Sequence, residues 1–434
     1  MNYYSLHKKS PEVSFREAVV RGIAPDRGLY FPDRILPLPD SFFANLGDFT
    51  NQEIAFEAIK TFVGDAIPKN ILKDILADVL DFDFPLVELE DNIASLELFH
   101  GPTMAFKDVG ARFMARCLGY FSEGSAAEIT VLVATSGDTG GAVANGFLGV
   151  PGVKVVILYP AGKVSAIQER QLTTLGQNIS ALEVAGTFDD CQHMVKTAFL
   201  DADIREQRTL TSANSINIAR WLPQMFYYLF AYKQLNGSAK DCIFSVPSGN
   251  FGNLCAGMVA RRLGLPVRHF IASTNINDTV PKFLESGQYK PKASKATISN
   301  AMDVGDPSNF ERIRHLYGDN FEALAENLTS YSFTDIATKE AIAHLFREFG
   351  YIADPHGAVG YLGLKKYLES HPGEYGIFLE TAHPIKFRDV VEAAIHRTLE
   401  MPEQIKKVMS GTKKTWPVSS YEGLKSFLLS DEKI

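Results

Sequence analysis

Short runs of almost uninterrupted apolar residues constrain the fold of this chain most strongly. Three of them occupy residues 129–134, 153–158 and 242–246. A strand of a parallel sheet is covered by helices on both faces, so its residues are apolar on both sides instead of alternating. Amphipathic stretches separate the runs, which is typical of βα units. The sequence therefore predicts an α/β fold in which sheet is flanked by helices.

Weaker patterns predict the remaining elements. Further strands are expected at residues 96–99, 270–272 and 377–379, and helices at 105–120, 165–175, 188–199 and 219–235. Before residue 90 the apolar residues recur at helical spacing, with one face from Ala55 to Val63 and another from Ile71 to Leu80. We expect a helix-rich N-terminal domain, residues 1–90, and a catalytic region, residues 91–434, within which 130–225 form a smaller subdomain.

Charge and cysteine usage exclude several classes of protein. The formal net charge of -8 argues against a nucleic-acid partner, which would need clustered Lys and Arg. No apolar run follows the basic residues of the N-terminus, so neither a secretory signal nor a membrane span is predicted, and a cytoplasmic location is expected. The cysteines lack the close pairing of a zinc site, so we expect buried, reduced thiols and no metal; they are Cys117, Cys191, Cys242 and Cys255.

Three predicted strands end in segments with the composition of a binding site. These segments are residues 135–141, 247–253 and 381–384. In open α/β sheets ligands bind beyond the carboxyl ends of the strands. The first two segments contain Ser, Gly and Asn and lead into helices, whose free N–H groups favour anions. The pattern predicts two anion sites, although each loop taken singly favours an ordinary capped connection. Neither loop matches a dinucleotide or P-loop pattern, which disfavours a nicotinamide dehydrogenase or an NTPase.

Lys107 lies between a predicted strand and a predicted helix, within the segment 101–108. In the first turn of a helix the dipole would lower the pKa of its amine and make it available for Schiff-base chemistry. Spacing alone favours an exposed structural lysine over a Schiff-base lysine.

The segment 98–108, LFHGPTMAFKD, closely resembles the cofactor-lysine segment of threonine synthases. Other signatures of that family follow in the family's order at residues 134–140, 212–217, 246–252, 354–356 and 381–384. The resemblance covers essentially the whole chain and is to the longer, microbial and fungal type. It implies a tryptophan-synthase-like pyridoxal-phosphate fold with two open sheets. It also implies conversion of O-phospho-L-homoserine and water to L-threonine and phosphate.

The resemblance also implies roles for individual residues. Lys107 would form the Schiff base with pyridoxal 5'-phosphate, and Thr381 would face the pyridine nitrogen. The phosphate of the cofactor would be bound by the loop that contains Gly249, Asn250, Phe251 and Asn253. The substrate would be bound by Ser136, Gly137, Asp138, Thr139, Asn214, Ser215 and Arg220, the last three receiving its phosphate.

Two residues depart from the pattern we expect of close relatives. Asn253 stands where an acidic residue is expected, and Glu380 where a small one is expected. The sequence leaves open whether Glu380 points at the cofactor ring. It also leaves open whether His100 and His383 move protons or are satisfied by the backbone.

Two other functions compete with this interpretation. A serine or threonine dehydratase of the same fold would share Lys107 and the glycine loop without needing Asn214, Ser215 and Arg220. A non-catalytic descendant that binds ligand for regulation would be expected to lose Lys107 or the loops, which this chain keeps. The oligomeric state is left open between a monomer and a small homo-oligomer.

Overall fold

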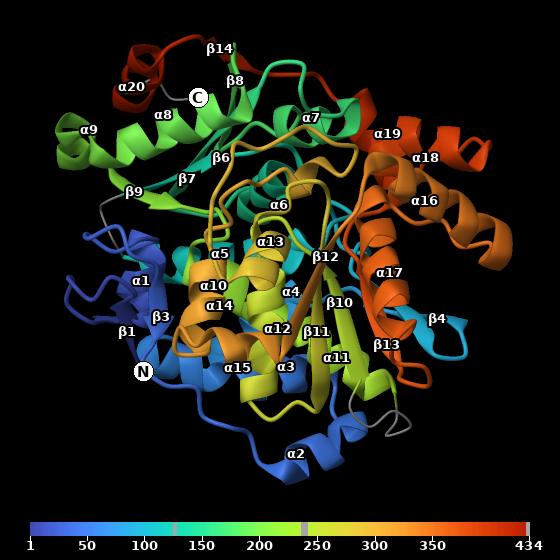
Figure 1. The fold of residues 1–434 in the computed structure, drawn as a ribbon. Helices are drawn as coiled ribbons and strands as arrows, with labels where there is room; N and C mark the ends of the chain where they lie inside the picture. Colours follow the sequence, from blue (N-terminus) through green and yellow to red (C-terminus); the bar gives the residue numbers. More distant parts are fainter. Residues whose placement is uncertain (125–127, 236–241, 431–434) are drawn as a thin grey trace. The chain divides into compact units, whose positions relative to one another are not determined.

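The computed structural model describes residues 1–124, 128–235 and 242–430 (Figure 1). The chain forms two compact units. Unit 1 consists of Met1, Pro32–Phe106 and Trp221–Glu400, and unit 2 of Asn2–Phe31, Lys107–Arg220 and Met401–Ile434. These two units do not correspond to the predicted domains 1–90 and 91–434. The domain boundaries remain a prediction.

Unit 1 is built on a six-stranded sheet with the order β12-β11-β10-β13-β5-β4. Every neighbouring pair is parallel except β4 and β5, which are antiparallel. The three strands predicted within residues 242–246, 270–272 and 377–379 are confirmed, and the one predicted at 96–99 lies slightly earlier. The strands are β4 (Leu86–Glu90), β5 (Ile93–Glu97), β10 (Cys242–Pro247), β11 (Val267–Thr274), β12 (Leu328–Ser332) and β13 (Gly376–Glu380).

Helices of unit 1 bury their apolar faces against this sheet and each other. One core cluster joins α16, α17 and α18 to buried residues of β5, β10, β11 and β13. The two helices predicted before residue 90 are confirmed as α3 and α4, with a short 3-10 turn at Gly64–Ala66 between them. The α-helices are α2 (Asp40–Ala44), α3 (Asn51–Val63), α4 (Lys69–Val79), α11 (Phe226–Gln234), α12 (Gly252–Arg262), α13 (Thr279–Ser286), α14 (Phe310–Leu316), α15 (Phe321–Ala325), α16 (Asp335–Phe349), α17 (Pro355–Leu368) and α18 (Arg388–Ile395).

Unit 2 has a five-stranded sheet, parallel throughout, with the order β14-β8-β7-β6-β9. Its strands are β6 (Ile129–Ala134), β7 (Val153–Pro160), β8 (Ile179–Val184), β9 (Thr209–Ser212) and β14 (Trp416–Val418). All residues of β6 are buried, as predicted for a strand covered on both faces. The longer helices are α5 (Lys107–Ser122), α6 (Asp138–Phe147), α7 (Ala166–Thr173), α8 (Phe188–Leu200), α9 (Ala202–Gln207), α19 (Glu403–Ser410) and α20 (Tyr421–Leu429).

Two expectations about secondary structure need correction. The N-terminal residues are not wholly helical, because β1 (Asn2–Ser5), β2 (Val13–Ser14) and β3 (Tyr30–Pro32) form a small sheet beside α1 (Phe15–Arg21). The helix expected at 219–235 is interrupted: α10 (Ile218–Trp221) passes into a 3-10 turn, Leu222–Met225, before α11. Pro223 lies in that turn, where its missing N–H and its ring disfavour a continuous α-helix.

All four cysteines are free and buried, which confirms the predicted burial of these thiols. Within the described residues, no helix combines the length and the apolar character needed to cross a bilayer. The same part of the chain contains no cluster of three or more side chains suited to hold a metal ion.

Candidate functional site

Two of the three predicted strand exits emerge side by side from the sheet of unit 1. Strands β10 and β13 are parallel neighbours, with Ile243 opposite Gly376 and Ser245 opposite Phe378. The segments that follow them, 248–253 and 381–384, therefore leave the same edge of the sheet (Figure 1). This is the edge at which open α/β sheets bind ligands.

The loop after β10 presents backbone amides at the start of α12. The N-cap residue of α12, Phe251, has a left-handed conformation with φ of 61° and makes no side-chain capping bond. The amides of the first helical turn have no intrahelical partner. Gly249 is tightly enclosed, since a Cβ there would lie 2.7 Å from both Ala301 O and Met302 Cα. Glycine is therefore required at this position by packing against residues 301–302, and the amides of the loop suit an anion.

Asn250 and Asn253 in this loop are each fixed by hydrogen bonds to other parts of the chain. The Oδ1 atom of Asn250 accepts a hydrogen bond from Ser308 N at 2.7 Å. The Tyr228 hydroxyl donates to the Asn253 Oδ1 atom at 2.9 Å and to its carbonyl oxygen at 3.0 Å. Asn253 Nδ2 is buried and has no hydrogen-bond partner among the described residues. A donor is therefore left over in the first turn of α12, which fits a phosphate group.

The exit of β13 is paired with the segment that leads to Lys107. Phe106 N donates to Thr381 O at 2.9 Å, His383 N donates to Met104 O at 3.0 Å, and Ala105 forms an isolated bridge with Ala382. Thr381 itself is buried. Lys107 follows Phe106 directly and is the first residue of α5, which confirms its predicted place at a helix N-terminus.

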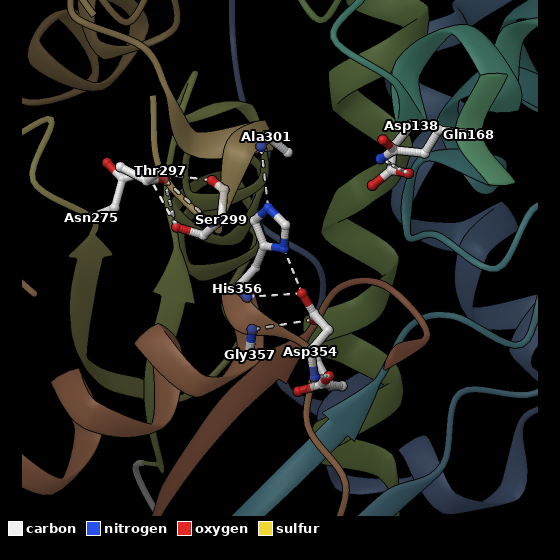
Figure 2. A network of polar contacts seen from close by, with 10 residues as sticks. Asp138, Gln168, Asn275, Thr297, Ser299, Ala301, Asp354, His356 and Gly357 are labelled. Carbon is white, nitrogen blue, oxygen red and sulfur yellow. Dashed lines mark hydrogen bonds and ion pairs between the residues drawn. The ribbon is translucent and has the colours of Figure 1, made fainter. Parts of the chain in front are cut away.

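In the loop after β6, in unit 2, a side chain of the loop accepts hydrogen bonds from the loop's own backbone amides. Thr135 Oγ1 accepts hydrogen bonds from Gly137 N at 3.0 Å and Gly140 N at 2.8 Å. Helix α6 begins at Asp138, four residues earlier than predicted, so Asp138 and Thr139 lie in its first turn. Gln168 Nε2 donates to Asp138 Oδ1 at 2.9 Å (Figure 2).

The structure brings Asn214 to the exit of β6, because Asn214 Nδ2 donates to the carbonyl oxygen of Ala134 at 3.0 Å. Ser215 is half-buried beside it in sequence. Arg220 is only 2% exposed, and its guanidinium donates to the carbonyl of Ala213. Arg220 is therefore not a solvated arginine on a helix face.

The two histidines left open by the sequence have defined partners. His383 Nδ1 accepts a hydrogen bond from Ile385 N at 3.1 Å, so it caps the 3-10 turn Pro384–Phe387 in its neutral form. Burial lowers the pKa of His383 to about 4. The exposed His100 contacts Glu97 Oε2 through Nε2 at 2.7 Å. In this structure His383 is satisfied by the backbone.

Sequence reasoning missed a buried polar network beside Thr381. It consists of Glu380 at the end of β13 and of Asp354 and His356 at the start of α17, which Figure 2 shows in part. The resemblance identified residues 354–356 as a family signature but implied no role for them. An Asp followed by Pro signals a helix start, but nothing local indicates contact with a residue 26 positions away.

Known proteins match this chain along nearly its full length. Three families match: "Threonine synthase N terminus" at residues 2–79, "Pyridoxal-phosphate dependent enzyme" at 85–378 and "Threonine synthase, C-terminal" at 357–427. The threonine synthase of Escherichia coli strain K12 is 45% identical over 409 residues, 93% of this chain and 94% of that protein.

Solved structures agree with these matches. A crystal structure of threonine synthase from Escherichia coli has a TM-score of 0.93 and 42% identity, covering 99% of both chains. A structure described as pyridoxal-phosphate-bound threonine synthase from Brucella melitensis has a TM-score of 0.92 and 33% identity, covering 99% of this chain and 98% of that one.

Proposed function

Because this chain belongs to the threonine synthase family of pyridoxal-phosphate-dependent enzymes, we propose that it converts O-phospho-L-homoserine and water to L-threonine and phosphate. The observation that carries the proposal is the 45% identity to a threonine synthase over more than nine-tenths of both chains. The expected family, α/β fold, cofactor class and lyase class are confirmed by these comparisons.

Five residues of unit 1 are proposed to hold the cofactor together with Lys107. The uncapped amides before α12 and the buried Asn253 donor support binding of its phosphate by Gly249, Asn250, Phe251 and Asn253. Thr381, at the end of β13, would face the pyridine nitrogen. The bond from Phe106 N to Thr381 O supports Lys107 as the residue that attaches the cofactor, because it fixes the preceding residue at this edge.

The first substrate group, in unit 2, is proposed at the exit of β6. It consists of Ser136, Gly137, Asp138 and Thr139. Thr139 offers its hydroxyl from the first turn of α6, Ser136 offers one from the loop before it, and Gln168 donates to the Asp138 carboxylate.

The phosphate of the substrate is proposed to bind Asn214, Ser215 and Arg220. The burial of Arg220 supports this role, since a desolvated guanidinium interacts strongly with a phosphate dianion.

Lys107 is proposed to move the protons of the reaction. The bound cofactor supplies the electron sink that makes the α-proton of the substrate acidic. Once its Nζ atom is free, Lys107 takes the α-proton and then moves the β-proton, which allows the γ-phosphate to leave. Thr381, as a neutral hydroxyl, would not hold a proton on the pyridine nitrogen as a carboxylate would. Water then adds its hydroxyl at the β-carbon, its proton leaves with the phosphate, and protons return to the γ- and α-carbons to complete L-threonine.

One assay separates this function from that of a dehydratase. The purified, cofactor-loaded enzyme is given O-phospho-L-homoserine in one reaction and L-threonine in another. We expect phosphate release in the first and little ammonia in the second. Ammonia from threonine without phosphate from O-phosphohomoserine would establish a dehydratase instead.

The remaining features of the proposal rest on the sequence alone. A cytoplasmic location, the absence of a nucleic-acid partner and a monomer or small homo-oligomer are proposed from charge and composition. The N-terminal domain at residues 1–90 belongs to the same group of proposals.

A further inference from the structure

The Glu380 carboxyl is fully buried between β13 and the start of α17. Its Oε1 atom accepts a hydrogen bond from Asp354 N at 2.5 Å. Its Oε2 atom has no hydrogen-bond partner among the described residues and lies where any side chain at Gly357 would collide with it. An ionised carboxylate in this position would carry a buried charge with a single donor, which is costly.

The adjacent Asp354 carboxylate is far better satisfied. It caps α17 and accepts from the backbone amides of His356 at 2.8 Å and Gly357 at 3.3 Å. Its Oδ1 atom also contacts His356 Nδ1 (Figure 2). His356 Nε2 accepts from Ala301 N at 3.2 Å, so the neutral ring carries its proton on Nδ1 and donates it to Asp354. Three donors thus stabilise the negative charge on Asp354.

The two carboxyls share a dry site, so only one of them is expected to be ionised. Burial, followed by the negative charge of Asp354, raises the pKa of Glu380 well above its usual range. The other groups that face Glu380 are Glu97 in β5, whose charge acts in the same direction, and Tyr351. A proton on Glu380 would let its carboxyl donate to the Asp354 carboxylate, which belongs to the residue whose backbone amide already donates to Glu380 Oε1.

This network joins both ends of the proposed cofactor site within unit 1. At one end, Glu380 precedes Thr381, and its carbonyl accepts from Leu98 N at 2.9 Å. At the other end, His356 holds Ala301, which encloses Gly249 together with Met302. The loop that would bind the phosphate and the residue that would face the pyridine ring are therefore connected through one set of buried hydrogen bonds.

We propose that Glu380 is a protonated positioning residue that donates a hydrogen bond to the Asp354 carboxylate, and that the Glu380–Asp354–His356 network sets the spacing between Thr381 and Gly249. The Glu380 side chain thus acts behind the cofactor site, through Asp354, and does not charge the ring. The positioning role rests on the proposed cofactor site, whereas the protonation state can be measured without any cofactor.

Infrared difference spectra test the proton directly. The spectrum of the cofactor-free wild-type protein at pH 8 minus that of Glu380→Gln should contain the carbonyl stretch of a protonated carboxylic acid. Glu392→Gln is the control, because that carboxyl lies on α18 and is bonded to Arg388. A difference spectrum that shows the loss of a carboxylate band for Glu380→Gln would overturn the proposal. This measurement needs only wild type and a near-isosteric variant.

Cofactor affinity tests the positioning role. Glu380→Gln keeps an acceptor for Asp354 N and, like the protonated acid, a donor for the Asp354 carboxylate, so its cofactor dissociation constant should match that of wild type. Glu380→Ala removes both bonds and should weaken cofactor binding roughly tenfold. Equal losses in both variants, or no loss in Glu380→Ala, would overturn the role. Failure of the phosphate-release assay with these binding results intact would count against the proposed reaction, not against Glu380.

Discussion

The loop after β10 and the loop after β6 have similar sequences but different backbone chemistry. Both leave a buried strand, contain glycine and start a helix. After β6, Thr135 Oγ1 accepts the amides of Gly137 and Gly140. After β10, the N-cap Phe251 offers no side-chain acceptor to α12. The comparison predicts that a glycine-rich strand exit is open to an anion through its backbone where no side chain has already taken the amides.

The largest expected effect concerns Lys107, the residue that would tie the cofactor covalently. In Lys107→Ala the loop after β10 is intact, so we expect the cofactor to bind more weakly but measurably, with loss of its visible imine absorbance. Turnover should fall by about a thousandfold or more, because the general base is removed. Spectra and phosphate release measure both effects, with Lys163→Ala as the control. Wild-type turnover in Lys107→Ala would exclude the assignment.

Gly249→Ala tests the loop after β10 itself. A Cβ at this position would lie 2.7 Å from two backbone atoms, so the loop must shift. We expect the cofactor dissociation constant to rise on the order of a hundredfold, the size of a few lost charge-assisted hydrogen bonds. Gly47→Ala is the matched control, since nothing lies within 4 Å of a Cβ there. Equal affinities for the two variants would show that this loop does not hold the phosphate.

A fall in pH should act locally on two buried histidines of unit 1, while protonation of Asp303, whose pKa burial raises to about 6, acts in the opposite direction. Burial lowers the pKa values of His269 and His383, both in unit 1, to about 4. Between the folded and the unfolded pKa values, such a histidine is neutral in the folded state and protonated in the unfolded state. The free energy of unfolding therefore decreases as the pH falls from 6.5 to 4. For each histidine the decrease is about 2 kcal/mol at pH 5. In unit 2, by contrast, hydrogen bonds to Tyr421 and Lys425 lower the pKa of Asp201 to about 2, so its stabilisation persists down to pH 4.

Hydrogen exchange at pH 7 and pH 5 measures this difference between the units. We expect β11 and the segment 381–387 to lose protection at pH 5 more than β6 does. The variant His269→Gln should reduce the loss in β11, and an unchanged loss would contradict the explanation.

The smallest expected effect concerns the loop after β6. Thr135→Val keeps the shape of the side chain but leaves the amides of Gly137 and Gly140 without their acceptor. We expect the KM for O-phosphohomoserine to rise about fivefold, close to 1 kcal/mol, with the cofactor dissociation constant unchanged. If only the cofactor dissociation constant changed, the loop after β6 would contact the cofactor. The contrast between this loop and the loop after β10 would then be wrong.

Local patterns were sufficient to predict the central strands and the place of Lys107 at the start of a helix. The role of Lys107 was implied only by the resemblance. Strand β6 was predicted to the residue, because a buried parallel strand is apolar throughout. Strands at the edges were missed, for example β4, whose residues are all half-buried or exposed, and β12, which has one buried residue. An edge strand needs fewer apolar residues, so its pattern is weak.

The sequence by itself determined which residues are apolar enough to form the central strands, where glycine permits close approach, and that Lys107 starts a helix. Only the tertiary structure decided that Phe106 pairs with Thr381, that Arg220 is buried, and that Glu380 lies against Asp354. The physical reason is distance along the chain. Helix and strand periodicity act over a few neighbouring residues, whereas desolvation and hydrogen bonding of a buried side chain depend on groups tens or hundreds of positions away.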